Sequence, residues 1–274
     1  MGKMKMQIGR MFALVTISVA TMGMTSACSS GMAGGTNVVG GTVDFSQGDL
    51  TEKPFTKIEV ETVADVYYTQ NDGDKQSVRF DYSQIKDEKT RQQFKEKVVA
   101  VYREGKLVIG LKGKITGSSR LNKGQRLRVY ITSPDLLKVT LEGVGSFNAD
   151  AINSDVFDID NEGVGNVTIK NLLANKVGID NEGVGSVSIG SLQSDHVNID
   201  NEGVGNVKIA QFKGGQLKID NEGVGKVEAQ VDCQSIHATL EGVGNIRLSG
   251  VTRHFVKTKE GVGSFKDSDL KVLE

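Results

Sequence analysis

Apolar and polar residues alternate in short runs through the second half of the chain, and each run meets the tetrapeptide Glu-Gly-Val-Gly. Before one copy, Val177 and Ile179 lie two residues apart, and after it Val187 and Ile189 do the same. Strict alternation of β-branched residues predicts a strand with one buried face. The glycines between two such runs predict a corner, because glycine tolerates the backbone angles and the close approach that a bend requires.

The tetrapeptide recurs with a nearly constant period. Its seven copies, 20 residues apart and finally 19 apart, begin at Glu142, Glu162, Glu182, Glu202, Glu222, Glu241 and Glu260. A unit of this length without a helical run buries its apolar face only by stacking on its neighbours. The signatures of leucine-rich repeats and of calcium-binding β-rolls are absent. We therefore predict an all-β fold, a right-handed parallel β-helix with rungs of about 20 residues.

The register of this alternation predicts a column of buried polar residues. If Val177 and Ile179 point inward, Asn181 does so as well. The equivalent residues of successive rungs are Leu141, Asn161, Asn181, Asn201, Asn221, Leu240 and Lys259. We expect the four asparagines to form an internal amide ladder, in which each side chain is hydrogen-bonded to the rungs above and below.

The amino terminus predicts export. Lys3, Lys5 and Arg10 precede an uncharged run over residues 11–24, which is typical of a secretory signal peptide and short for a membrane-spanning helix. The segment that follows, Thr25-Ser26-Ala27-Cys28, resembles the bacterial lipobox, in which the cysteine is lipidated. The alternative is an ordinary signal peptide with an incidental cysteine.

These features define the expected domains. We expect a lipoprotein signal peptide over residues 1–27, lipidation of Cys28, and a flexible Gly/Ser-rich tether over residues 28–50. A single β-helix domain is expected over residues 51–274, with irregular capping rungs over 51–135 and regular rungs over 136–266. The expected location is the cell envelope, with the lipid anchor in a membrane, namely the outer membrane.

The segment before the regular repeats also reads as strands. The expected strands are Lys57–Tyr68, Ser77–Tyr82, Lys97–Leu111 and Leu127–Thr132. The highly charged stretch Lys86–Lys97 is expected to be an exposed loop or a short helix.

Several segments together resemble the head domain called GIN, which is found in putative auto-transporter adhesins and in many bacterial lipoproteins. The segments are Phe55–Val60, Asp65-Val66-Tyr67, Gly105–Ile109, Val129–Leu136 and the repeated Gly-x-Gly corners. The resemblance covers most of residues 50–270. It implies a right-handed β-helix at the cell envelope, and it implies no ligand and no catalytic residue.

Two columns of carboxylates are expected on the outer surface, because residues two apart on a strand share a face. The residues are Asp160, Asp180, Asp200 and Asp220 in one column and Glu162, Glu182, Glu202 and Glu222 in the other. Carboxylates about 4.8 Å apart repel one another. Fanned side chains, salt and nearby lysines can relieve the repulsion, and the alternative is calcium held weakly between rungs.

A basic segment is a second candidate contact. Lys112, Lys114, Arg120, Lys123, Arg126 and Arg128 lie within it. They are interpreted either as a solvated loop or as a contact for anionic glycans or lipid head groups. The formal net charge of −1 gives no reason to expect nucleic acid as a partner.

The residue pattern does not favour an enzyme. The carboxylates recur identically, whereas catalysis needs one constellation with differently tuned pKa values. His196 and His254 are expected in one column but three rungs apart, so they cannot share a zinc ion. Cys233 is expected to be a small core residue.

The leading hypothesis is a non-enzymatic envelope lipoprotein that presents a rigid surface for binding, adhesion or scaffolding, with a glycan or an envelope protein as partner and no cofactor. The alternatives are a polysaccharide-active β-helix enzyme, either a lyase or a hydrolase, and a purely mechanical spacer.

Overall fold

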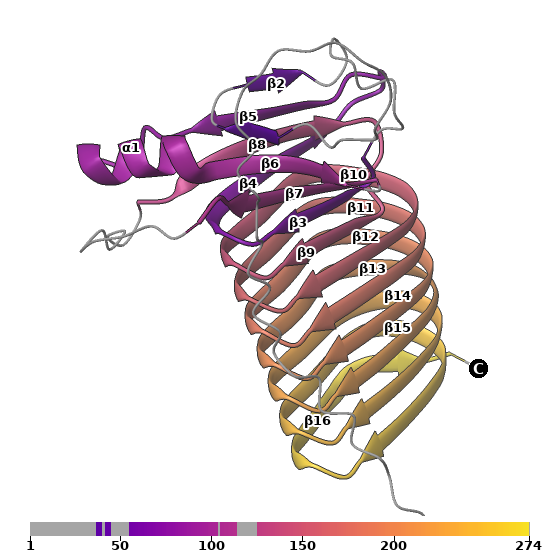
Figure 1. Cartoon of the computed structure of the whole chain (residues 1–274). Coiled ribbons are helices and arrows are strands. Elements are labelled where there is room, and N and C mark those ends of the chain that lie inside the picture. Colours follow the sequence, from indigo (N-terminus) through magenta and orange to yellow (C-terminus); the bar gives the residue numbers. More distant parts are fainter. Residues whose placement is uncertain (1–36, 40–41, 45–54, 104, 114–124, 274) are drawn as a thin grey trace, which may run out of the picture. The chain divides into compact units, whose positions relative to one another are not determined.

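Six long strands, each one complete coil, and a shorter final strand make up most of the structure (Figure 1). They are β10 (Val144–Asn161), β11 (Val164–Asn181), β12 (Val184–Asn201), β13 (Val204–Asn221), β14 (Val224–Leu240), β15 (Val243–Lys259) and β16 (Val262–Val272). Only the Glu-Gly pair of each tetrapeptide interrupts the strand between one coil and the next. The repeat therefore closes one turn of a parallel β-solenoid.

The computed structural model describes residues 37–39, 42–44, 55–103, 105–113 and 125–273. The predicted signal peptide and Cys28 lie outside these residues. Consecutive coils pair in parallel and in register, so that Val164 faces Val184 and Asn181 faces Asn201. The offset is 20 residues along most of the stack and 19 at its carboxyl-terminal end, where Val224 faces Val243. The tetrapeptides are therefore stacked directly above one another, and the predicted parallel solenoid is confirmed.

Two sheet extensions continue from the first coil towards the amino terminus. On one side β10 pairs with β4 (Val63–Gln70), and β4 pairs with β8 (Leu127–Ser133). On the other side β10 pairs with β9 (Lys138–Leu141), which is followed by β3 (Lys57–Val60) and β7 (Lys106–Leu111). All these pairs are parallel, so they continue the hydrogen-bonding pattern of the coils.

Each extension ends in antiparallel strands. β5 (Ser77–Asp81) pairs with β8, and β6 (Val98–Arg103) pairs with β7. The outermost strands are β1 (Asn37–Val39), beside β6, and β2 (Thr42–Asp44), beside β5. Both lie in the segment 28–50, so at these residues the expectation of a flexible tether is corrected. Asn-Val-Val and Thr-Val-Asp contain β-branched residues that favour strands, which the Gly/Ser-rich composition of the whole segment obscured.

The charged stretch before β6 forms a helix rather than a loop. Helix α1 (Glu88–Lys97) begins after Asp87, whose side chain accepts a hydrogen bond of 2.7 Å from the backbone N–H of Thr90. Such an acidic N-cap satisfies one of the free N–H groups of the first turn. Thr90 and Phe94, which are four residues apart, are the buried residues of the helix.

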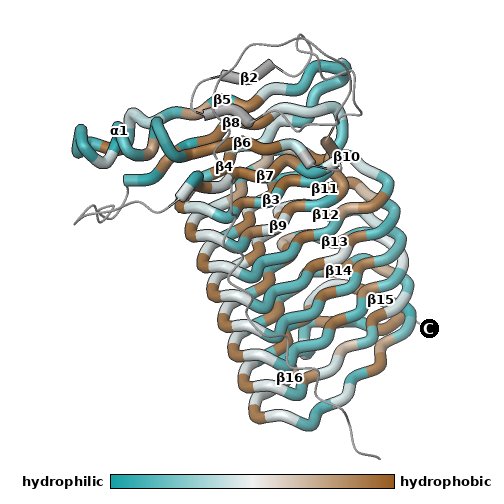
Figure 2. Tube along the Cα trace, in the orientation of Figure 1, coloured by the Kyte–Doolittle hydropathy of each residue, from teal (hydrophilic) through white to brown (hydrophobic). Residues whose placement is uncertain are grey.

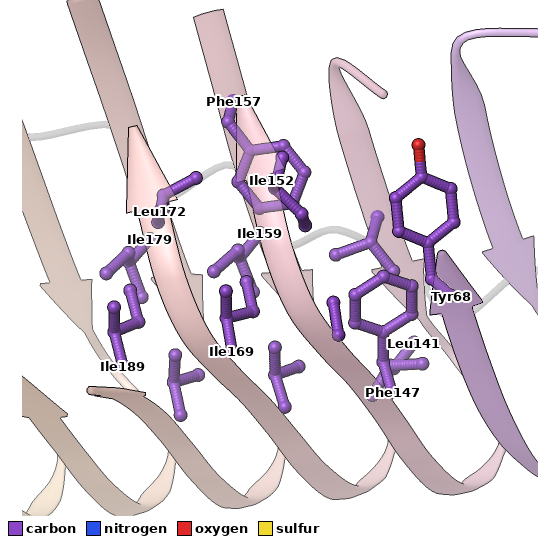
Figure 3. Close-up of a cluster of buried hydrophobic side chains, with 14 of the residues drawn as sticks. Tyr68, Leu141, Phe147, Ile152, Phe157, Ile159, Ile169, Leu172, Ile179 and Ile189 are labelled. Atoms are coloured by element: carbon purple, nitrogen blue, oxygen red, sulfur yellow. The ribbon is translucent and has the colours of Figure 1, made fainter. Parts of the chain in front are cut away.

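The core consists of inward-facing columns along the solenoid. Figure 2 shows brown and teal positions alternating along the coils. In Figure 3, Ile159 and Ile179 come from equivalent positions of successive coils, as do Ile169 and Ile189. All four are at most 1% exposed. Stacking therefore buries an apolar face that no single coil could bury alone.

The carboxyl-terminal coils carry charge at inward positions. Lys257 and Lys259 are in register with Ala238 and Leu240 of the preceding coil. Lys257 pairs with Asp267 of β16 and lies over the rings of Phe255 and Phe265. Charged residues at inward positions are one means by which β-proteins discourage further strand pairing.

Candidate functional site

The corner of each coil is built on direct contact between stacked glycines. A Cβ atom added to Gly205 would lie 1.6 Å from the carbonyl oxygen of Gly185, and one added to Gly203 would lie 2.2 Å from that of Gly183. Such distances are sterically forbidden, because the backbones of neighbouring coils touch at the corner. Both glycines of the tetrapeptide therefore have a structural role.

Four asparagines fill the interior beside this corner. Asn161, Asn181, Asn201 and Asn221 are each 0% exposed. Within this column each amide Nδ2 donates to the Oδ1 of the next coil, over 2.7 Å, 2.7 Å and 2.6 Å. Oδ1 of Asn161 and Nδ2 of Asn221, at the two ends of the column, have no partner. The column is flanked by Leu141 and Leu240.

The other two residues of the tetrapeptide face outward. All seven glutamates are exposed, and so are the valines that follow them two residues later. The valines are Val144, Val164, Val184, Val204, Val224, Val243 and Val262, which we call the valine rib. The glutamates form a parallel column beside it, which we call the glutamate column. The corner therefore displays an apolar row next to an acidic row.

Both rows extend into a coil that lacks the tetrapeptide. Val60 is in register with Leu141, and Val63 with Val144, so Glu61 stands in the glutamate column. Thr62 and Ala64 replace the two glycines, which concealed this coil in the sequence. The strands beside them are not joined by the tetrapeptide, because β7 ends at Leu111 and β8 begins only at Leu127.

A second acidic column, the aspartate column, lies two residues before the glutamates and consists of Asp160, Asp180, Asp200 and Asp220. Lysines pair with the aspartates at its two ends. Lys138 pairs with Asp160, and Lys218 pairs with Asp220 at 2.5 Å. In the middle, Oδ1 of Asp180 and Oδ1 of Asp200 are buried without a hydrogen-bond partner.

This arrangement changes the acidity of the central aspartates. Burial, followed by the charges of Glu182 and Asp200, raises the pKa of Asp180 to about 6. Burial and the charge of Asp220 also raise the pKa of Asp200. The expected repulsion along the column is therefore present and is not fully relieved by lysines.

In the part of the chain that the structure describes, the carboxylates of the predicted calcium ladder include no three whose oxygens all lie within 4.8 Å of one another. Among the described residues, the group of three carboxylates whose oxygens all lie within 4.8 Å of one another is Glu59, Glu61 and Glu142, at the start of the stack. Glu59 is paired with Lys106. The pKa of Glu142 is raised by burial and by Glu59 and Glu162. This group was not anticipated, because the register that joins β3 to β9 cannot be seen in the sequence.

The predicted basic segment is only partly described. Lys112 is exposed, whereas Lys114, Arg120 and Lys123 lie outside the described residues. Arg126 is half-buried and forms an ion pair of 3.0 Å with Asp65. Arg128 lies near Asp81 and contributes, after the hydrogen bonds from Ser83, to lowering the pKa of that carboxyl. The described arginines thus stand beside carboxylates of the same sheet.

The same sheet carries an outward stack of aromatic rings, which no pattern in the sequence indicated. The rings of Tyr67 and Tyr130 are stacked with their centroids 5.3 Å apart. The guanidinium carbon of Arg79 lies 4.0 Å from the centroid of Tyr130. Because the stack uses these ring faces internally, it offers little aromatic surface to a sugar.

The three histidines of the chain line one shallow lateral groove of about 740 Å³. His196 and His254 occupy the same column on β12 and β15, and His237 lies in a neighbouring column on β14. Among the residues that the structure describes, Asp158 is the only carboxylate in its lining. A glycosidase of the usual kind requires two carboxyl groups, so this groove lacks that arrangement.

Cys233 is a core residue. It is 6% exposed, and its Sγ lies 3.6 Å from Oγ1 of Thr252. Burial raises the pKa of its thiol. A reactive cysteine is instead partly exposed and has a lowered pKa.

No helix among the described residues is long and apolar enough to cross a membrane.

Comparisons with known proteins identify similar folds. A putative adhesin from Bacteroides fragilis NCTC 9343 is 23% identical, with a TM-score of 0.56 over 84% of this chain and 96% of that one. A putative adhesin from Parabacteroides distasonis ATCC 8503 is 16% identical, with a TM-score of 0.54 over the same shares. None of the curated proteins matches the chain.

The model of one protein family matches residues 54–251 and 197–274, which together span most of the sequence. This match covers the irregular coils as well as the regular ones. The chain therefore belongs to the family described as putative auto-transporter adhesin, head GIN domain.

Proposed function

We propose that this protein is a lipid-anchored protein of the cell envelope that presents a rigid β-helical surface for binding, adhesion or scaffolding, without catalysis. The observation that carries the proposal is the regularity of the outer surface, on which the same exposed residues recur at every corner. A surface of repeated, equivalent groups suits multivalent or extended contact, whereas a catalytic site needs one distinct constellation.

Membership in a family of putative adhesins supports a binding role. The lipid anchor is supported by the sequence, in which a signal-like segment leads to Ala27-Cys28. Beyond that cysteine, eight residues precede Asn37, where β1 begins. A segment of this length could separate the domain from a membrane surface.

The anchor is tested by labelling cells with an alkyne analogue of palmitate. Wild-type protein should carry the label and remain with the membrane fraction, and the Cys28→Ser variant should lose both properties. Protease treatment of intact cells, compared with lysed cells, then reports whether the domain faces outward. An unlabelled wild-type protein would contradict the lipid anchor.

The binding role is tested with a glycan array and a reducing-sugar assay on the same purified protein. Retention of a glycan without turnover supports a binding protein. Release of reducing ends would instead establish the alternative, a polysaccharide-active enzyme.

A further inference from the structure

Two exposed positions stay the same in all seven tetrapeptides, while other positions on the outer surface vary. Four residues before the glutamate, successive coils carry Asp158, Gly178, Asn198, Lys218, His237 and Val256. Six residues after it they carry Asn148, Thr168, Ser188, Lys208, Glu228, Arg247 and Lys266. The repeats have therefore diverged widely on the surface, yet the glutamate and the valine have not.

The fold explains why the glycines and the buried asparagines of the repeat stay the same, but it does not explain the exposed glutamate and valine. The glycines are required by backbone contact at the corner, and the asparagines by the amide column. Where that column ends, Leu240 and Lys259 replace asparagine, but Glu241, Val243, Glu260 and Val262 persist. The exposed pair is thus independent of the interior beside it.

Within the molecule the glutamate column is unfavourable. Burial, and after it the charges of Asp200, Glu182 and Glu222, raises the pKa of Glu202. The valine rib is also open to solvent, with Val164, Val184, Val204, Val224 and Val243 each between 51% and 53% exposed. Stacked valines bury part of one another, but that packing does not require a row of glutamates beside them.

We propose that the valine rib and the glutamate column together form a docking surface for a cationic amphipathic α-helix of a partner. This inference rests on the proposed binding role and names the chemistry of the partner. An apolar stripe on such a helix would cover the valines, and lysines or arginines along one side of that stripe would face the glutamates.

The dimensions suit a single helix. From Val144 to Val262 the rib makes six steps between coils, which at about 4.8 Å each span about 29 Å. A helix of about 19 residues has this length, and its turns of about 5.4 Å are close to the spacing between coils.

The charge is one-sided, which sets the orientation of the partner. On the flank opposite the glutamates, the position two residues beyond each valine is mostly neutral: Ser146, Asn166, Ser186, Asn206, Lys226, Asn245 and Ser264. Two copies facing each other with antiparallel solenoid axes would bring their glutamate columns together, and like charges repel. With parallel axes each glutamate column would face the mostly neutral flank of the other copy and gain no counter-charge. A cationic helix therefore complements this surface better than a second copy does.

The test uses the purified full chain and a fluorescent helical peptide of about 19 residues, with leucines in one stripe and lysines along one flank. A second peptide has the same composition in scrambled order. Anisotropy titrations are run at low and high salt. We expect binding of the striped peptide that weakens with salt, and binding by the scrambled peptide weaker by on the order of tenfold.

Two sets of substitutions test separately whether the valine rib and the glutamate column contact the peptide. The set Val164→Thr, Val184→Thr, Val204→Thr and Val224→Thr keeps the shape of the rib and removes its apolar character. The set Glu182→Gln, Glu202→Gln and Glu222→Gln removes charge. Each set should raise the dissociation constant on the order of tenfold.

Matched controls lie on other faces. Val156→Thr with Val256→Thr changes exposed valines outside the rib, and Asp150→Asn, Asp195→Asn and Asp232→Asn changes exposed carboxylates outside the column. Both control sets should leave affinity within about twofold, which is the scale of an energetically neutral contact. Thermal melts verify that every variant is folded.

Equal affinity for the two peptides, or no effect of the valine set, would overturn the proposal, because attraction between opposite charges alone would then explain binding. The scrambled-peptide and salt comparisons need no variant, so misfolding cannot hide the answer. Failure of Cys28 labelling would remove the proposed anchor while leaving peptide binding intact. The two proposals therefore fail separately.

Discussion

Nδ2 of Asn181 donates to Oδ1 of Asn201 across 2.7 Å in the interior of the solenoid, where both side chains are 0% exposed. The same contact is made from Asn161 to Asn181 and from Asn201 to Asn221. Each interior asparagine is thus both a donor and an acceptor. The column is satisfied as a set, and only its two ends lack partners.

Replacing one interior member should therefore destabilise its neighbours. Asn201→Leu leaves Nδ2 of Asn181 and Oδ1 of Asn221 without partners, and each buried unsatisfied group costs about 1–3 kcal/mol. We expect a lower melting temperature and a lower free energy of unfolding in urea. Asn198→Leu, at an exposed position, is the control. A melting temperature at or above that of the wild type would show that the ladder does not stabilise the fold.

The stability of the fold should depend strongly on the absence of a side chain at the glycine corners. Gly205→Ala would place a Cβ atom 1.6 Å from the carbonyl oxygen of Gly185, so the coils must separate locally. We expect a loss of at least about 3 kcal/mol or failure to fold, as for other severe overpacking. At Gly73 an added Cβ has nothing within 4 Å, so Gly73→Ala should be tolerated. Similar urea midpoints for the two variants would refute direct backbone stacking at the corner.

The aspartate column predicts a protein that is less stable at neutral than at mildly acidic pH. The pKa of Asp180 rises from its ordinary 3.8 to about 6 in the folded state, chiefly through burial. Between these values the folded state binds more protons than the unfolded state, so its contribution to stability falls as pH rises from about 4 to about 6.

The comparison of wild type with Asp180→Asn isolates this effect. The variant should melt at a higher temperature than the wild type at pH 7, and the difference should shrink as pH falls towards 4. Asp195→Asn, an exposed aspartate on another face, serves as the control and should show no such trend. A variant less stable than wild type at pH 7 would contradict an unfavourable charge at Asp180.

Cys233 should resist thiol reagents in the folded protein. Its side chain is buried and its pKa is raised, so little thiolate is accessible. Mass spectrometry after brief iodoacetamide treatment at pH 8 should find Cys233 unmodified in native protein and fully modified in urea. Rapid native modification would indicate that this coil opens.

Recognition from sequence succeeded where coils repeat. Asn181 and Asn201 could be assigned to one inward column because identical residues at a constant offset stack in a solenoid. The coil that contains Glu61 and Val63 was missed because Thr62 and Ala64 stand at its corner. The pairing of β1 with β6 and of β2 with β5 was missed for a related reason, since these antiparallel edge strands are not part of the repeat.

By itself, the sequence determined the parallel solenoid, the inward and outward positions of the regular coils, and the acidic columns at the corner. These follow from a repeat in which every coil makes the same local contacts with the next. Only the tertiary structure decided the grouping of Glu59 with Glu142, the stack of Tyr67 on Tyr130, and the groove that collects the three histidines. Those arrangements depend on how non-repeating segments pair and on how side chains from several coils share one surface, and no single stretch of sequence contains that information.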